Sequence, residues 1–213
     1  MQSTRRQFLK ALTDVGLGAA GCGVRALPGP GVDDGSRAAV GPEAVLSGLI
    51  ALVLPFEHPD FPALSPSDVE RRFEARLAQD PEAEAALRVA LMGFDTIPRF
   101  SDVSSALDEA ESASIQAFEA LDAERLAERL GDLRAREAGL HDAFTIRHGR
   151  LQRFVGASAA AQADYLHMWG QSAYLLKRRF YVGTRALVLT SAYSMSPLWD
   201  AMGYDGPLLE RPS

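Results

Sequence analysis

Helix-start signals recur along this chain, and they are typical of an all-α fold. Ser65-Pro66-Ser67-Asp68 places a capping serine before a proline at the first helical position, and Asp80-Pro81-Glu82 repeats the pattern. Pro42-Glu43 and Ala157-Ser158 mark two further starts. No stretch alternates polar and apolar residues with β-branched enrichment, so a sheet is not expected. We therefore predict an irregular multi-helix bundle over residues 42–213, with a long C-terminal helix and an aromatic tail.

Apolar spacing defines the individual helices of this bundle. We expect helices over 42–53, from 66 through 77, from 81 to a point before Pro98, and over 159–170. The segment 101–139 has helical periodicity, with breaks expected at Gly131 and Gly139; its apolar positions are Ile115, Phe118, Leu121, Leu126, Leu130 and Leu133. Phe144, Leu151 and Phe154 are assigned to another short helix.

The last long helix is expected from about Ser172 to Ser194, and it carries two apolar stripes. One stripe holds Leu176, Phe180, Thr184, Leu187 and Ser191, and its neighbour holds Leu175, Val182, Ala186, Leu189 and Tyr193. Because the combined face is broad, we expect this helix to be central and covered on more than one side. Lys177-Arg178-Arg179 is either a solvated face or a surface that pairs with an acidic partner.

Residues 1–22 have the pattern of a twin-arginine export signal. Arg5 and Arg6 are followed by Phe8 and Leu9, and the segment after them is weakly apolar and rich in glycine. This route carries folded proteins, so periplasmic localisation is expected. Ala19-Ala20-Gly21-Cys22 makes Cys22 a candidate for lipidation and membrane tethering, with a chance cysteine in a removed leader as the alternative. Residues 23–41, rich in glycine and proline, are expected to be a flexible linker before the domain at 42–213.

Several classes of function lack their residue patterns in this sequence. The net charge of −6 argues against nucleic acid as a partner, and one cysteine excludes cysteine-based haem, iron–sulfur and zinc sites. A helical di-iron site needs Glu-x-x-His on two helices, whereas the nearest pair is Glu137 with His141. There is also no phosphate loop, nucleophile elbow or uncharged spanning segment. We expect no catalytic, cofactor-binding or metal-binding residue in this chain.

The stretch Leu187–Pro207 is aromatic and rich in turn residues, which indicates a docking element. Trp199 and Tyr204 each combine a large apolar body with one polar atom, as residues at the centre of an interface often do. From the residues alone, docking on the chain's own helices and docking on a partner remain equally open.

The C-terminal third resembles the family named after gluconate 2-dehydrogenase subunit 3. Its most specific mark is the ending Trp-x-x-x-Gly-Tyr-x-Gly-Pro over residues 199–207. The other matching residues are Phe154, Ala157, Ser158, Gln162, Tyr165, Leu166, Trp169, Ser172, Arg185, Leu187, Val188, Tyr193, Pro197, Leu198 and Asp205. The short spacing from Tyr193 to Trp199 is similar to that in small subunits of other flavin-dependent oxidoreductases of the GMC type.

This resemblance implies a non-catalytic accessory subunit that binds a large FAD-containing GMC dehydrogenase, supplies its export signal and aids its maturation. FAD is expected in that partner, and a cytochrome c subunit often completes such assemblies. The implied interface holds Tyr193, Pro197, Trp199, Gly203, Tyr204, Gly206 and Pro207. Contact with a membrane is expected only through a lipid anchor or the complex. Two alternatives remain: a ferritin-like exported metal protein and a free-standing exported helical lipoprotein.

Overall fold

The computed structural model describes residues 41–95, 100–151 and 153–203, with the backbone alone over 100–106. The predicted leader and linker, including Arg5, Arg6, Phe8, Leu9 and Cys22, lie outside the described residues. So do Tyr204, Gly206 and Pro207 of the predicted interface. The described residues form eight helices and no strand, which confirms the all-α prediction. The helices are α2 (Pro42–Val53), α3 (Pro66–Leu77), α4 (Pro81–Asp95), α5 (Phe100–Phe118), α6 (Ala123–His148), α7 (Ala159–Gln171), α8 (Leu175–Tyr193) and α9 (Ser196–Ala201).

Local capping explains why α3, α4 and α7 begin where the sequence predicts. Ser65 and Asp68 form a reciprocal capping box at the start of α3, with the Ser65 Oγ accepting from the Asp68 N–H at 3.2 Å. The Asp80 carboxylate accepts from the Ala83 N–H at 3.1 Å, and the Ser158 hydroxyl accepts from the Ala161 N–H at 3.3 Å. Each contact satisfies a backbone donor that the first helical turn leaves unpaired.

The predicted breaks in the middle of the chain are wrong. The chain leaves α5 at Phe118 and starts α6 at Ala123, with the Asp122 side chain accepting from the Arg125 N–H at 2.9 Å. Gly131 and Gly139 both lie inside α6, since a glycine costs a long helix only about 1 kcal/mol and does not have to end it. The helix ends instead at Gly149, which has the positive φ of 74° that only glycine adopts freely.

The short helix predicted for Phe144, Leu151 and Phe154 is also wrong. Phe144 belongs to α6, while Leu151 and Phe154 lie in the connection between α6 and α7. That connection is held by the fully buried carboxylate of Asp95, which pairs with Arg153 and accepts the Val155 N–H at 2.9 Å. Phe154 enters the core because of these distant contacts rather than through helical periodicity.

An aromatic cluster around Phe94 is the centre of the core. The Phe94 ring lies 4.8 Å from Phe154, 5.0 Å from Tyr165, 4.9 Å from Trp169 and 5.1 Å from Phe180 between centroids. These rings come from α4, α7, α8 and the α6–α7 connection, so one cluster joins distant parts of the chain.

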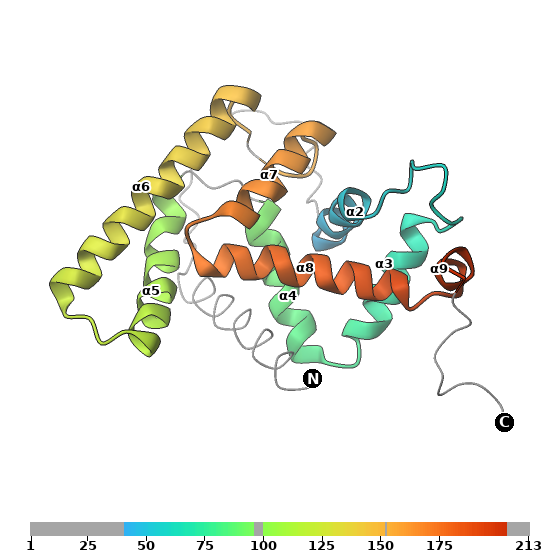
Figure 1. Ribbon diagram of the computed structural model, residues 1–213, viewed down its shortest axis with the longest axis horizontal. Coiled ribbons are helices and arrows are strands. Elements are labelled where there is room, and N and C mark those ends of the chain that lie inside the picture. Colours follow the sequence, from blue (N-terminus) through green and yellow to red (C-terminus); the bar gives the residue numbers. More distant parts are fainter. Residues whose placement is uncertain (1–40, 96–99, 152, 204–213) are drawn as a thin grey trace, which may run out of the picture.

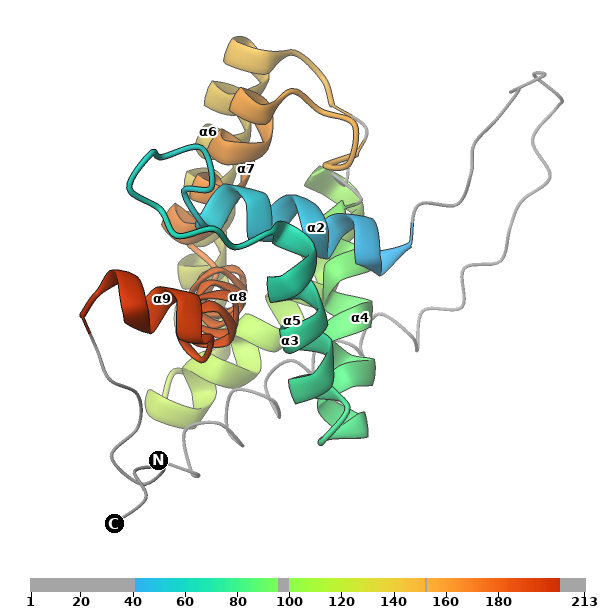
Figure 2. The ribbon, with the colours of Figure 1, turned by 90° about the vertical axis from the view of Figure 1, so that its right-hand side faces the viewer.

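Helix α8 crosses the molecule from the side of α5 and α6 to the side of α9 (Figure 1). It packs against α2, α3, α5, α7 and α9. The hairpin of α5 and α6 lies at one edge, and α9 lies near the opposite end of α8 (Figure 1). Figure 2, in which α8 is seen nearly end-on, shows α8 and α9 at one side of the molecule and α4 at the other.

Candidate partner-binding face

The two predicted stripes of α8 have different surroundings. On the inner side, Phe180, Thr184 and Ser191 are buried, in agreement with the first predicted stripe, and Val188 and Ala192 are buried with them. On the outer side the expected covering is wrong, because Val182 is 62% exposed and Tyr193 is 50% exposed. Only one side of α8 is therefore covered by the described helices.

We call the residues Val182, Ala186, Leu189 and Tyr193 the outer stripe. They follow one another at spacings of four, three and four residues, which places them on one face of the helix. Ala186 is exposed, and Leu189 is half-buried where it meets the edge of the core. The stripe is thus an apolar helix face from Val182 to Tyr193 that is exposed at three positions and half-buried at Leu189.

The segment after α8 is anchored to the domain and also carries an exposed apolar side chain. The indole N–H of Trp199 donates to the Tyr193 carbonyl oxygen at 2.6 Å, and Leu198 is buried. Pro197 lies in the first turn of α9, Gly203 has a positive φ of 66°, and Met202 is 54% exposed. The tail therefore docks on its own domain through Leu198 and Trp199, while Tyr193 and Met202 remain available to a partner.

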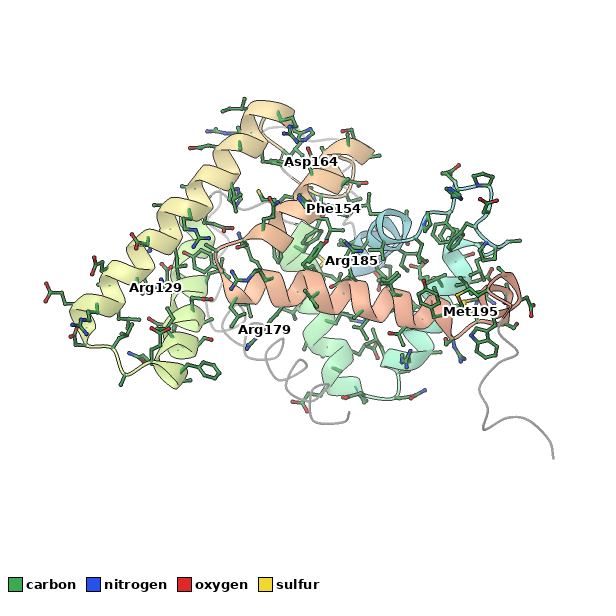
Figure 3. The ribbon with its side chains drawn as sticks, in the orientation of Figure 1. Arg129, Phe154, Asp164, Arg179, Arg185 and Met195 are labelled. Atoms are coloured by element: carbon green, nitrogen blue, oxygen red, sulfur yellow. The ribbon has the colours of Figure 1, made fainter. Side chains whose placement is uncertain are left out.

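Two arginines of α8 lie close to the outer stripe in sequence, Arg179 three residues before Val182 and Arg185 directly before Ala186. Figure 3 shows Arg179 near the start of α8 and Arg185 further along it. The Arg185 guanidinium donates to the Tyr181 hydroxyl at 2.6 Å and lies 5.3 Å from the centre of that ring. Tyr181 in turn packs closely against Gly170 of α7, where an added Cβ would lie 2.9 Å from the ring. Arg185 is therefore held in place beside the stripe.

The basic run Lys177-Arg178-Arg179 is not one surface. Lys177 is only 5% exposed, and its ammonium group donates to a Glu137 carboxylate oxygen at 2.6 Å and lies 5.4 Å from the centre of the Trp169 ring. Arg178 donates to the carbonyl oxygens of Ser172 and Ala173 at 2.5 and 2.7 Å. The prediction of a common solvated face is wrong for Lys177, because a buried carboxylate 40 residues earlier is its partner.

Glu137 joins α6 to the turn between α7 and α8. Besides Lys177, it accepts the Ser172 hydroxyl at 2.7 Å and the Ala173 N–H at 3.1 Å. Burial acts to raise the pKa of Glu137, but the charge of Lys177 and these hydrogen bonds outweigh it and hold the pKa below its ordinary value. The carboxylate is therefore ionised and paired in the folded protein.

Helix α5 is joined to the same turn by two more carboxylates. The Tyr174 hydroxyl donates to Asp108 at 2.7 Å, and Asp108 also pairs with Arg134 at 2.7 Å. The Leu175 N–H donates to Glu111 at 2.9 Å. Burial raises the pKa of Tyr174, so its phenol stays protonated and keeps donating. Sequence reasoning missed this network, and no local signal could have found it, because each contact joins residues 26 to 66 positions apart.

The histidines do not converge. His58 lies on an exposed loop and His167 on the surface of α7, while His148 lies 2.8 Å from Asp164 and His141 lies 3.9 Å from Glu137. Within the described ranges, no three His, Cys, Asp or Glu side chains gather in a metal-binding arrangement. In the same part of the chain, no helix has the length and apolar character needed to cross a bilayer.

Comparison of the chain with protein-family models, with curated proteins and with solved structures finds no match.

Proposed function

We propose that this protein is a non-catalytic accessory subunit that binds a large FAD-dependent oxidoreductase of the GMC type, brings it the twin-arginine export signal and aids its maturation. The observation that carries this proposal is the outer stripe of α8, an apolar helix face that the described part of the domain leaves uncovered. The kind of partner is proposed from the sequence resemblance over residues 151–207.

The distribution of exposed apolar side chains supports binding at this face. Seven large apolar side chains are exposed in the described residues, and three of them, Val182, Tyr193 and Met202, lie on the single segment α8–α9. Exposed apolar side chains that recur on one face of a helix, as Val182, Ala186 and Tyr193 do, indicate a protein interface more strongly than scattered single residues do. Tyr193 also offers a phenol at the edge of the face, which suits an interface with an apolar centre and a polar rim.

The remaining parts of the proposal come from the sequence. The leader at 1–22 would carry the folded complex across the membrane, with FAD in the partner and a cytochrome c as a third component. The product would be periplasmic, and tethered if Cys22 is acylated.

The test is co-expression with a GMC flavoprotein encoded beside this chain. Val182→Asp with Ala186→Asp places two charges on the outer stripe, and we expect at least a tenfold loss of co-purified flavoprotein. Burial of unpaired carboxylates costs several kcal/mol, while the free subunit keeps its fold because both positions are exposed.

Ile146→Asp is the matched control, because Ile146 is 86% exposed on α6, away from the stripe. Circular dichroism checks that all variants stay folded. Equal recovery of flavoprotein with the stripe variant and the control would contradict the proposal.

A further inference from the structure

A groove lies between the α5–α6 hairpin and the start of α8, separate from the outer stripe. Its volume is about 390 Å³. Ile115 and Leu133 contribute apolar walls, the turn at Ser172 and Ala173 also lines the groove, and three arginines line it: Arg129, Arg136 and Arg178. Figure 3 shows Arg129 on α6 and Arg179, which does not line the groove, near the start of α8.

Two arginines of α6 that line the groove have no partner among the described residues. Arg129 and Arg136 are exposed, and neither forms an ion pair or hydrogen bond with any residue that the structure describes. Arg134 on the same helix differs, because its guanidinium is engaged by Asp108. The two free guanidinium groups are seven residues apart, which is about 10.5 Å along the helix axis and on one face.

Two carboxylates at the inner side of the groove are already engaged. Glu111 accepts the Leu175 N–H at 2.9 Å, and Glu137, behind Ser172, is paired with Lys177. The lining therefore carries three positive charges against one negative charge, in a chain whose net charge is −6. A local positive groove on an acidic protein attracts an anionic ligand without attracting polyanions to the rest of the surface.

We propose that this groove binds an acidic polypeptide segment, with carboxylates reaching Arg129 and Arg136 and an apolar side chain resting on Leu133 and Ile115. Two carboxylates two helical turns apart match the separation of these arginines along α6. The apolar walls favour a polypeptide over a bare inorganic anion, and the small net charge of the groove disfavours nucleic acid, which needs a longer basic stripe. The inference does not depend on which protein covers the outer stripe.

The test uses the full-length protein and a fluorescein-labelled deca-glutamate peptide, followed by fluorescence anisotropy at 50 and 200 mM salt. We expect saturable binding that weakens with salt. Arg129→Gln with Arg136→Gln should weaken it at least tenfold, because the peptide loses two charge-assisted hydrogen bonds and the attraction of two positive charges. The fold is expected to persist, since neither side chain has a partner to lose among the residues that the structure describes.

Arg71→Gln with Arg150→Gln is the charge-matched control, because it removes two exposed arginines elsewhere. Binding by this control should stay within twofold of the unmodified protein. Equal weakening by the two pairs would show that only net charge matters and would overturn the proposal. Absence of peptide binding, or displacement of the peptide by inorganic phosphate at equal total charge, would overturn it as well.

Discussion

At the scale of single residues, the Glu137–Lys177 pair matters because both partners are almost fully enclosed. Glu137 is 1% exposed, and its two oxygens accept from Lys177, Ser172 and the Ala173 N–H. A buried pair adds little stability compared with an apolar pair of the same volume, but removal of one partner leaves a charge without compensation. The pair therefore favours one arrangement of α6 against the α7–α8 turn over alternatives that would separate the two charges.

Lys177→Met should lower the free energy of unfolding by about 3–5 kcal/mol at pH 7, measured by urea denaturation. In the unmodified protein the pKa of Glu137 is lowered on folding, so its stabilising contribution is present above the unfolded pKa and is lost as pH falls through the folded pKa. In the variant, burial dominates and raises the pKa of Glu137. The difference in free energy of unfolding between Lys177→Met and the unmodified protein should then become smaller as the pH is lowered from 7 to 5.

The control for this experiment is Glu137→Gln combined with Lys177→Met. It removes both charges and keeps an amide oxygen to accept from Ser172 and Ala173, so it should recover most of the lost stability. A deficit in Lys177→Met that does not change with pH would show that lost packing, rather than an unpaired carboxylate, is the cause.

At the scale of elements, glycines in similar helices have different roles. Around Gly139 in α6 no atom lies within 4 Å of an added Cβ, whereas at Gly170 in α7 that Cβ would lie 2.9 Å from the Tyr181 ring. Gly139 is therefore a tolerated helix residue, and Gly170 permits the close approach of α8 to α7.

Alanine at these two positions is expected to change the free energy of unfolding in opposite directions. Gly139→Ala should raise the free energy of unfolding by up to about 1 kcal/mol, because alanine has the higher helix propensity. Gly170→Ala should lower it by about 1–3 kcal/mol, since the Tyr181 ring and Arg185 have to move. Thermal and urea denaturation measure both. Equal shifts in the two variants would mean that the α7–α8 approach does not constrain position 170.

How much of the fold could be predicted depends on whether a helix boundary is local. The starts of α3, α4 and α7 were predictable, because Ser65, Asp80 and Ser158 cap the first turn of their own helices. The α6–α7 connection was not, since Asp95 holds it from about 60 residues away.

The candidate partner-binding face was also predictable only as far as its local pattern reaches. Both stripes of α8 are visible in the sequence, but periodicity does not say which of them the other helices cover. The pairing of Lys177 with Glu137 could not be predicted either, because a lysine in a basic run has the same local pattern whether it is buried or exposed.

At the scale of the whole molecule, the α5–α6 hairpin is attached differently from the other helices. In α2, Val45, Leu46, Leu49 and Ile50 are buried, whereas the buried side chains described in α5 are Asp108 and Glu111. In α6 only Leu133 and Phe144 add buried apolar groups. The α5–α6 hairpin is thus held to the domain largely by polar contacts with the α7–α8 turn. Regions with few buried apolar contacts open locally at lower free energy than an apolar core does.

Hydrogen exchange should therefore be at least tenfold faster in α5 and the first half of α6 than in α4 and α8, as measured by mass spectrometry. Tyr174→Phe removes the hydroxyl that Asp108 accepts, and it should speed exchange in α5 while leaving α2 to α4 unchanged. Uniform exchange across all helices would show that the hairpin opens only with the whole domain.

The place of α8 in the chain also sets an order of events during synthesis. The helix that contacts α2, α3, α5 and α7 leaves the ribosome after all four of them, and its end meets α3 through Arg72 and Ser194, 122 residues apart. Translation at roughly 5–20 residues per second puts on the order of 10 s between residue 22 and α8. Under the proposed export function, the arginine pair at residues 5 and 6 is therefore synthesised well before the core can close, and transport of a folded complex would require that translocation begin more slowly than α8 docks.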